Sequence, residues 1–136
     1  MNGRYKKVNT SNASTQGKLL TWMGILLIAL EGLIHLLDAP GSFDDATYKG
    51  LLFMAIVLGA AVASIGIYQG RRWGWSLGAL IAGSAFLGYV ISRTIGLPGL
   101  PVDEWLEPLG ILSLLVESLF LGLYLVVPIP RSTSLN

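Results

Sequence analysis

The sequence predicts an all-α fold, an integral membrane four-helix bundle with short loops. Of its 136 residues, 53% are hydrophobic and 12% are charged, and the mean hydropathy is +0.65. A soluble domain carries about 25% charged residues. Four apolar stretches have the roughly 20 residues that a helix needs to cross a bilayer. These stretches cover about 19–37, 48–68, 75–92 and 109–127. Helices are expected because an isolated strand cannot satisfy its backbone in lipid.

The flanking residues divide the chain into three parts. Residues 1–17 are rich in Ser, Thr and Asn, and they are predicted to form a disordered tail. A transmembrane domain over residues 18–128 and a C-terminal tail over residues 129–136 follow. The first span is interpreted as a retained signal anchor, because no clean cleavage site follows it.

Proline and glycine mark the turns between the spans. The run Asp38-Ala39-Pro40-Gly41 is predicted to end the first helix, because proline lacks an N–H and glycine frees the turn. The second turn is expected at 70–72 and the third at 96–101, and Pro128 and Pro130 are expected to stop the last helix.

The placement of the basic residues predicts the orientation in the membrane. Seven of the nine basic residues fall before the first span, between the second and third, or after the fourth. The other two connections hold Lys49 and Arg93 beside six acidic residues. By the positive-inside rule, both termini are expected in the cytoplasm.

Small residues recur at intervals of four along two of the spans. The second span has Ala55, Gly59 and Ala63, and the third has Gly74, Gly78 and Ala82. Small residues at this period let helix backbones approach closely. We expect them to pack inside one bundle. The alternative is a contact between copies of the chain. The expected partner is the lipid bilayer, and assembly as a homo-oligomer or within a larger membrane complex is also possible.

Ionisable residues at membrane depth are the candidate functional residues. Glu31, His35 and Asp38 follow the i, i+4, i+7 pattern, so they share one helix face. At about 1.5 Å per residue, Glu31 lies on the order of 10 Å below the outer end of its helix, and Glu117 on the order of 12 Å below the same level. A carboxylate that faces lipid costs about 2.5–3.5 kcal/mol on insertion scales. Both are therefore expected to point into the bundle.

Other polar residues are predicted to reach the same end of the bundle. Arg93 closes the third helix, Tyr89 lies one turn below it, and Ser113 lies one turn above Glu117. Because Arg93 is the nearest cation expected, an ion pair between Arg93 and one of the two buried carboxylates is predicted.

Three interpretations of this cluster remain open. Glu31, His35 and Glu117 could bind one divalent metal ion, helped by Asp38, since imidazole and carboxylates are suitable ligands. The cluster could instead be a proton relay or small polar ligand pocket near neutral pH. It could also be a satisfied structural network that only fixes helix register.

Several function classes are excluded by the sequence. A single histidine cannot supply the two axial ligands of a bis-His haem, and cysteine is absent, so no thiolate site exists. A retinal Schiff base is not expected because no lysine is expected inside a span. The chain has no phosphate-binding loop, dinucleotide fingerprint or zincin motif, and its basic residues are too dispersed for nucleic-acid binding.

The segments RRWGWSLGAL, YVISRTIGLPGLP and WLEPLGILSLLVESLFLGLYL resemble parts of small four-helix bacterial membrane proteins of uncharacterised function. The resemblance covers roughly residues 19–127. It implies the fold and a location in the bacterial cytoplasmic (inner) membrane, and it carries no activity, cofactor or catalytic residue. Among functional roles, the sequence favours a non-catalytic binding or accessory protein. The alternative is a protein that binds or transports metal ions or protons through Glu31, His35 and Glu117.

Overall fold

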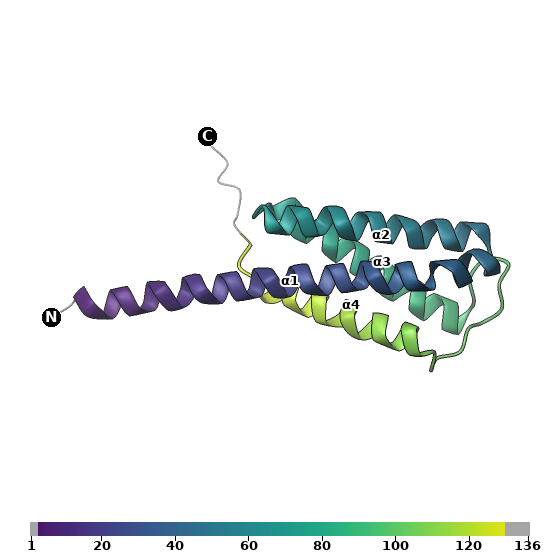
Figure 1. Cartoon of the computed structure of the whole chain (residues 1–136). Helices are drawn as coiled ribbons and strands as arrows, with labels where there is room; N and C mark the ends of the chain where they lie inside the picture. The colour runs from purple at the N-terminus through teal and green to yellow at the C-terminus, as the bar shows by residue number, and fades with distance from the viewer. Residues whose placement is uncertain (1–2, 130–136) are drawn as a thin grey trace, which may run out of the picture.

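The computed structural model describes residues 3–129, with side chains from residue 12 onward. It consists of four helices (Figure 1). They are α1 (Gly3–Asp45), α2 (Thr47–Tyr68), α3 (Arg72–Thr94) and α4 (Pro108–Val126). The all-α four-helix fold predicted from the sequence is confirmed. The predictions for residues 1–2 and 130–136 lie outside the described residues.

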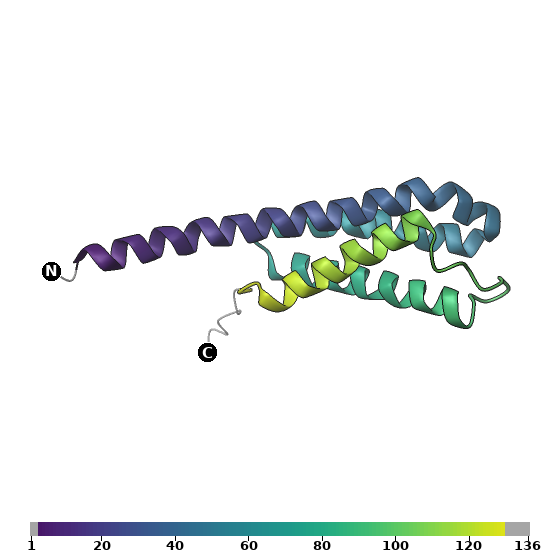
Figure 2. The same cartoon turned by 90° about the horizontal axis from the view of Figure 1, so that it is seen from below.

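The first helix is longer at both ends than the sequence predicts. It begins at Gly3, so it contains most of the tail for which disorder was expected. The prediction that residues 38–41 end it is wrong, because α1 continues through Pro40 to Asp45. Proline removes one helical hydrogen bond, but Ala39 and Ser42 beside it are buried, 4% and 2% exposed. Tertiary packing therefore outweighs the local signal, and α1 changes direction in its last turns (Figures 1 and 2).

The helices form a ring in chain order. Helix α1 packs along α2 and α4, α3 packs along α2 and α4, and α1 and α3 touch only slightly across the bundle. One end of the bundle carries the short turn at Ala46 and the connection 95–107, and we call it the loop end. The other end carries the turn at residues 69–71, and we call it the tail end (Figure 1).

The apolar core lies toward the tail end. It joins Ile28 of α1 and Ile67 of α2 to Trp75 of α3 and Phe120 of α4. The rings of Trp75 and Phe120 stack with centroids 5.9 Å apart. Small residues permit this packing: Ala63 and Ala82 are fully buried. The small residues of α3 thus pack inside one bundle, as expected from their spacing.

Helices α2 and α3 are closest at the tail end and separate toward the loop end (Figure 1). At the tail end their backbones touch, because a Cβ built on Gly74 would lie 2.5 Å from the backbone of Gly66 and Ile67. Further along, a Cβ on Gly59 would meet the side chain of Ile81. The separation of the two helices leaves room for a cavity nearer the loop end.

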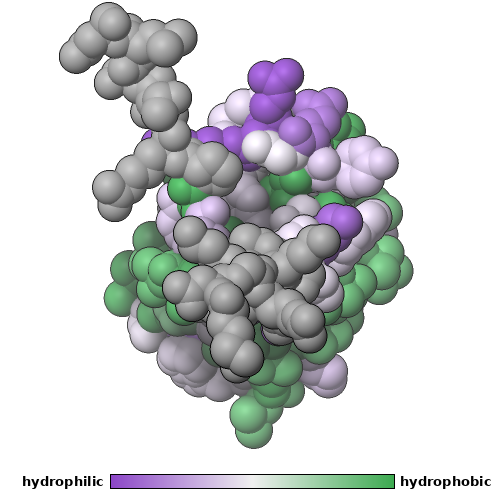
Figure 3. Space-filling model, turned by 90° about the vertical axis from the view of Figure 1, so that its left-hand side faces the viewer, coloured by the Kyte–Doolittle hydropathy of each residue, from purple (hydrophilic) through white to green (hydrophobic). Residues whose placement is uncertain are grey.

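The surface between the two ends is apolar. Leu26, Leu58 and Leu80, from three different helices, are 65% to 67% exposed. Seen from the tail end, hydrophobic residues form most of the flanks, while the most hydrophilic residues gather toward one side of the view (Figure 3). Each of the four helices is long and apolar enough to cross a membrane. The chain is a multi-pass membrane protein in contact with the lipid bilayer.

The 95–107 connection is held to the bundle by hydrogen bonds. The Tyr89 hydroxyl donates to the carbonyl of Trp105 over 2.7 Å, and the Tyr48 hydroxyl donates to that of Pro98 over 2.7 Å. The backbone N–H of Asp103 donates to the carbonyl of Ser92. Gly96 has a φ of 81°, which only glycine adopts readily. This connection therefore lies fixed across the loop end.

Candidate metal centre

Three ionisable side chains, two carboxyls and one imidazole, meet inside the bundle. Glu31 and His35 come from successive turns of α1, and Glu117 comes from α4. Glu31 and Glu117 are each 1% exposed and His35 is 6% exposed. Each residue offers one ligand atom, and these atoms all lie within 4.8 Å of one another. The expectation that both carboxylates reach the same depth is confirmed by this convergence. We call these three residues the Glu–His–Glu cluster.

A backbone carbonyl beside its ring favours one tautomer of neutral His35. Its Nδ1 lies 3.0 Å from the backbone carbonyl oxygen of Glu31, one turn earlier. A carbonyl oxygen only accepts, so Nδ1 carries the proton and donates. The other nitrogen, Nε2, then keeps its lone pair. Metal-binding histidines commonly donate one ring N–H to a carbonyl and bind the ion with the other nitrogen. Phe53 packs against the ring, with centroids 4.8 Å apart.

The two carboxylates of the cluster have unused acceptor atoms. Ser113 donates a 2.5 Å hydrogen bond to Oε1 of Glu117. Within the described residues, Oε2 of Glu117 and both side-chain oxygens of Glu31 have no hydrogen-bond partner. Oε1 of Glu31 is 3.2 Å from His35 Nδ1, whose proton is directed at the backbone carbonyl. Buried polar atoms normally have partners, so these three oxygens leave room for a proton or a cation.

The predicted pairing of Arg93 with a buried carboxylate of the cluster is wrong. Within the described part of the chain, the ion pairs of Arg93 are with Glu107, at 2.8 Å, and with Asp103, at 3.8 Å. Its guanidinium also donates to Ser92 and to the carbonyl of Glu104. The long side chain thus reaches toward the 95–107 connection, away from the interior. Its carbon Cζ lies 3.7 Å from the centre of the Tyr89 ring, a cation–π contact.

Lys49 is a charged residue of this region that was predicted to lie in the connection between the first two spans. It lies in the first turn of α2, so the expectation that no lysine falls inside a span does not hold. Its Nζ is 2.6 Å from Asp45 and 3.9 Å from Asp103. Asp45 and Lys49 are four residues apart, but they lie on either side of the helix break at Ala46, so the i, i+4 pattern of a single helix does not predict this pair.

A cavity of about 710 Å³ connects the loop end with the cluster. His35, Ser113 and Glu117 line its deep end, and Lys49 and Arg93 line its mouth. The predicted site residues Asp38 and Tyr89 also line it. Asp38 is half-buried and has no ion pair within the described residues, and Tyr89 supports Arg93 and the 95–107 connection. The lining also includes apolar side chains, among them Phe53, Ile56 and Ile81.

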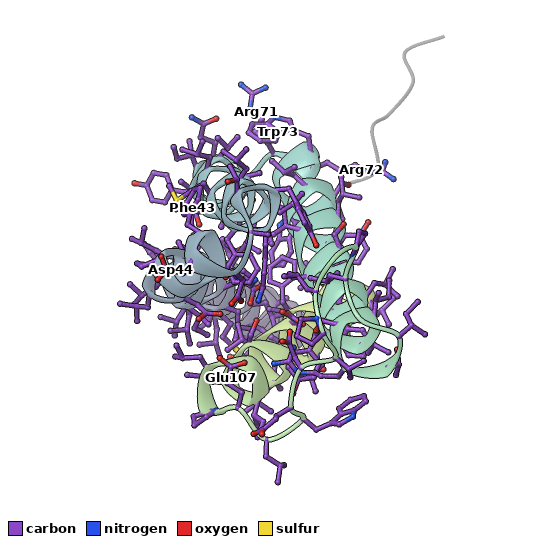
Figure 4. The ribbon with its side chains drawn as sticks, turned by 90° about the vertical axis from the view of Figure 1, so that its right-hand side faces the viewer. Phe43, Asp44, Arg71, Arg72, Trp73 and Glu107 are labelled. Atoms are coloured by element: carbon purple, nitrogen blue, oxygen red, sulfur yellow. The ribbon has the colours of Figure 1, made fainter. Side chains whose placement is uncertain are left out.

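Seen from the loop end, the four helices surround a centre filled by side chains (Figure 4). Glu107 lies at the start of α4, beside the 95–107 connection. Asp44 points away from the centre and does not line the cavity. Glu107 lines the cavity and Asp44 does not, so Asp44 is a suitable control position.

Comparisons of the chain with models of protein families, with curated proteins and with solved structures found no match. No family is therefore identified, and function has to be argued from the site. One nitrogen and two carboxylate ligands are a donor set that suits divalent ions such as Zn²⁺ and Mn²⁺. The same atoms could also share a proton between Glu31 and Glu117.

Proposed function

We propose that the protein is a non-catalytic binding protein of a bacterial cytoplasmic membrane that holds one divalent metal ion between Glu31, His35 and Glu117. Both termini would lie in the cytoplasm, in keeping with the seven basic residues at the tail end and its flanks. The loop end, where six acidic residues gather, would face outward. Such a small bundle could act alone, as a homo-oligomer, or as an accessory subunit of a larger membrane complex.

One observation carries the metal proposal: the ligand atoms of the cluster lie within 4.8 Å of one another while three carboxylate oxygens in it lack a partner. A purely structural network would satisfy these atoms, because an unpaired buried acceptor costs about 1–3 kcal/mol and a charged one more. Within the described residues, His35 is the one basic side chain within ion-pair distance of either carboxylate. The two carboxyls therefore need a proton or a cation between them, and the three converging ligand atoms favour the cation.

The arrangement also fits the coordination that these ions prefer. The three side chains are held on two rigid helices, and the N–H of His35 is already directed at a backbone carbonyl. The hydroxyl of Ser113 orients the carboxylate of Glu117 by donating a hydrogen bond to Oε1. Three protein ligands leave at least one coordination position for water, and that position would face the cavity that His35 and Glu117 line.

The test is metal analysis of protein purified in detergent, followed by calorimetric titration with Zn²⁺ and Mn²⁺. We expect one ion per chain, and loss of binding in Glu31→Gln and His35→Ala variants. The matched control is Asp44→Asn, which removes an acidic group that does not line the cavity. Protein that carries no ion, and whose melting temperature stays the same in both metals, would refute the metal proposal.

Proton handling is the second candidate, and the proximity of Glu31 and Glu117 favours it. Two buried carboxyls this close share protons rather than ionise independently. If the purified protein binds neither metal, infrared spectra of the carboxyl groups should show a protonated carboxyl band that Glu117→Gln alters. Absence of any such band in metal-free protein would count against this candidate.

A further inference from the structure

The cavity is larger than an ion alone needs. At about 30 Å³ per molecule of water, 710 Å³ would hold on the order of twenty waters. An ion could therefore stay hydrated until it reaches the deep end. Most of the wall offers no ligand, since residues such as Ile56 and Ile81 are apolar. Ligand atoms concentrate at the mouth and at the deep end.

The mouth has an excess of negative charge. Five acidic residues line it against two basic ones, Lys49 and Arg93; the acids are Asp38, Asp45, Asp103, Glu104 and Glu107. Both basic groups are engaged: Lys49 with Asp45 at 2.6 Å, and Arg93 with Glu107 at 2.8 Å. A low-dielectric opening lined by one sign of charge concentrates counter-ions. Cations are therefore favoured at the mouth over anions.

The opposite side of the cluster is closed. One turn or more toward the tail end lie Ile28 and Phe120, which are 0% and 1% exposed. Trp75 stacks on Phe120, and Ile67 and Ala63 of α2 complete this layer with no exposed surface. A second pocket lies at the tail end, around Lys18 and Trp75, and it shares no lining residue with the cavity. The apolar layer separates the two.

We propose that the cavity is a one-sided entrance, through which a divalent cation reaches the Glu–His–Glu cluster from the loop end only. This inference rests on the proposed metal site. The acidic mouth attracts the hydrated ion, which diffuses through the cavity. His35 and Glu117 then replace some of its water ligands. Because the apolar layer closes the far side, the ion leaves by the way it came. The protein captures cations at one face of the membrane and does not conduct them.

The chain contains no cysteine, so single cysteines can report which face reaches a position. Ser84→Cys places the reporter on the cavity lining. Ser76→Cys, eight residues earlier on α3, is exposed near the tail end and identifies that face of the membrane. Ser64→Cys lies on α2, outside the cavity lining, and is the control for a position that neither face should reach.

Each variant is reconstituted in vesicles and treated with a membrane-impermeant thiol reagent from outside, or from both sides after detergent opening. We expect Ser84→Cys to react only from the face opposite to that of Ser76→Cys. Bound Mn²⁺, which prefers carboxylate ligands to thiolates, should slow its reaction several-fold, and Ser64→Cys should react from neither face. Reaction of Ser84→Cys from the Ser76 face, or from neither face, would overturn the one-sided entrance.

Calorimetry on the same Ser84→Cys protein separates the two proposals. If it binds a stoichiometric ion but labels from the wrong face, the entrance is refuted while the metal site stands. If it binds no ion although it is folded by circular dichroism, the metal site itself is refuted, whatever the labelling pattern.

Discussion

Arg93 hydrogen-bonds the carboxylate of Glu107 over 2.8 Å, across the junction between α3 and α4. The contact ties the end of one helix to the residue that precedes the next. It also keeps the guanidinium, which is itself buried, out of ion-pair distance of Glu117. The charges of the loop end thus form one set of interactions and the Glu–His–Glu cluster forms another.

A double-mutant cycle should show this separation. We expect Arg93→Ala and Glu107→Gln to couple by about 1 kcal/mol, because they remove the same ion pair, in which Arg93 is buried and Glu107 is half-exposed. Arg93→Ala and Glu117→Gln should be additive within about 0.5 kcal/mol. The measurement is chemical unfolding of the purified protein in detergent. A larger coupling between Arg93 and Glu117 would mean that the guanidinium reaches the cluster after all.

Gly110→Ala should loosen the loop end. A Cβ at this position would lie 2.7 Å from Nη2 of Arg93 and 2.7 Å from the ring of Tyr89, so both side chains would have to move. Their hydrogen bonds to the 95–107 connection would be lost, and amide hydrogen exchange there should become faster. Gly122→Ala is the matched control on α4, because its Cβ would meet nothing within 4 Å. Equal exchange in both variants would contradict this role for Gly110.

Phe120→Ala should destabilise the bundle strongly. The ring is 1% exposed and packs on Trp75 and against Gly78. Its removal leaves a cavity, and we expect a loss of about 3 kcal/mol in the free energy of unfolding. Leu119→Ala, next to it on the half-exposed surface, should change that free energy by less than about 1 kcal/mol. Similar losses for the two variants would contradict the assignment of the core.

Metal should stabilise the wild-type chain and not the Glu117→Gln variant. A ligand that binds only the folded state at 100 times its dissociation constant adds about 2.7 kcal/mol to the free energy of unfolding. The amide of the variant replaces a charged ligand, so this gain should disappear. Addition of a chelator should reverse the gain in the wild type. A shift of the same size in Glu117→Gln would remove Glu117 from the ligand set.

Neutralising the mouth should slow the association of metal with the cluster. We expect Asp38→Asn combined with Glu104→Gln to lower the association rate by a factor of a few at low salt. The effect should shrink in 0.5 M salt, because exposed charges are screened there. Asp44→Asn removes a nearby charge outside the cavity lining and should leave the rate unchanged. Equal slowing by both changes would point to a general surface effect.

The sequence predicts the helices of this protein better than their side-chain partners. Hydropathy marks all four spans, because apolar length is the dominant requirement in a bilayer. The meeting of Glu31 and Glu117 was predicted by counting residues inward from Asp38 and Leu109, although α1 itself continues past Asp38 to Asp45. Such counting works because each helix rises by a fixed amount per residue.

Residues near the helix ends are predicted less well. Pro40 is a strong local signal for a helix end, but burial of its neighbours overrides it. The extra turn places Asp45 at the end of α1, where it pairs with Lys49 in the first turn of α2. The partner of Arg93 was also predicted wrongly. Its long side chain can reach inward to Glu117 or outward to Glu107, and no sequence pattern decides between these two carboxylates.

The contact between Gly66 and Gly74 lies at the far end of the bundle from the cavity. Because the two backbones meet there, it acts as a pivot from which α2 and α3 diverge (Figure 1). The helix from Gly74 to Gly88, at the cavity, is a lever arm of roughly 21 Å. A methyl group at Gly74 would therefore change the width of the cavity by tilting this arm. The geometry around a bound ion is thus adjustable by residues that never approach it.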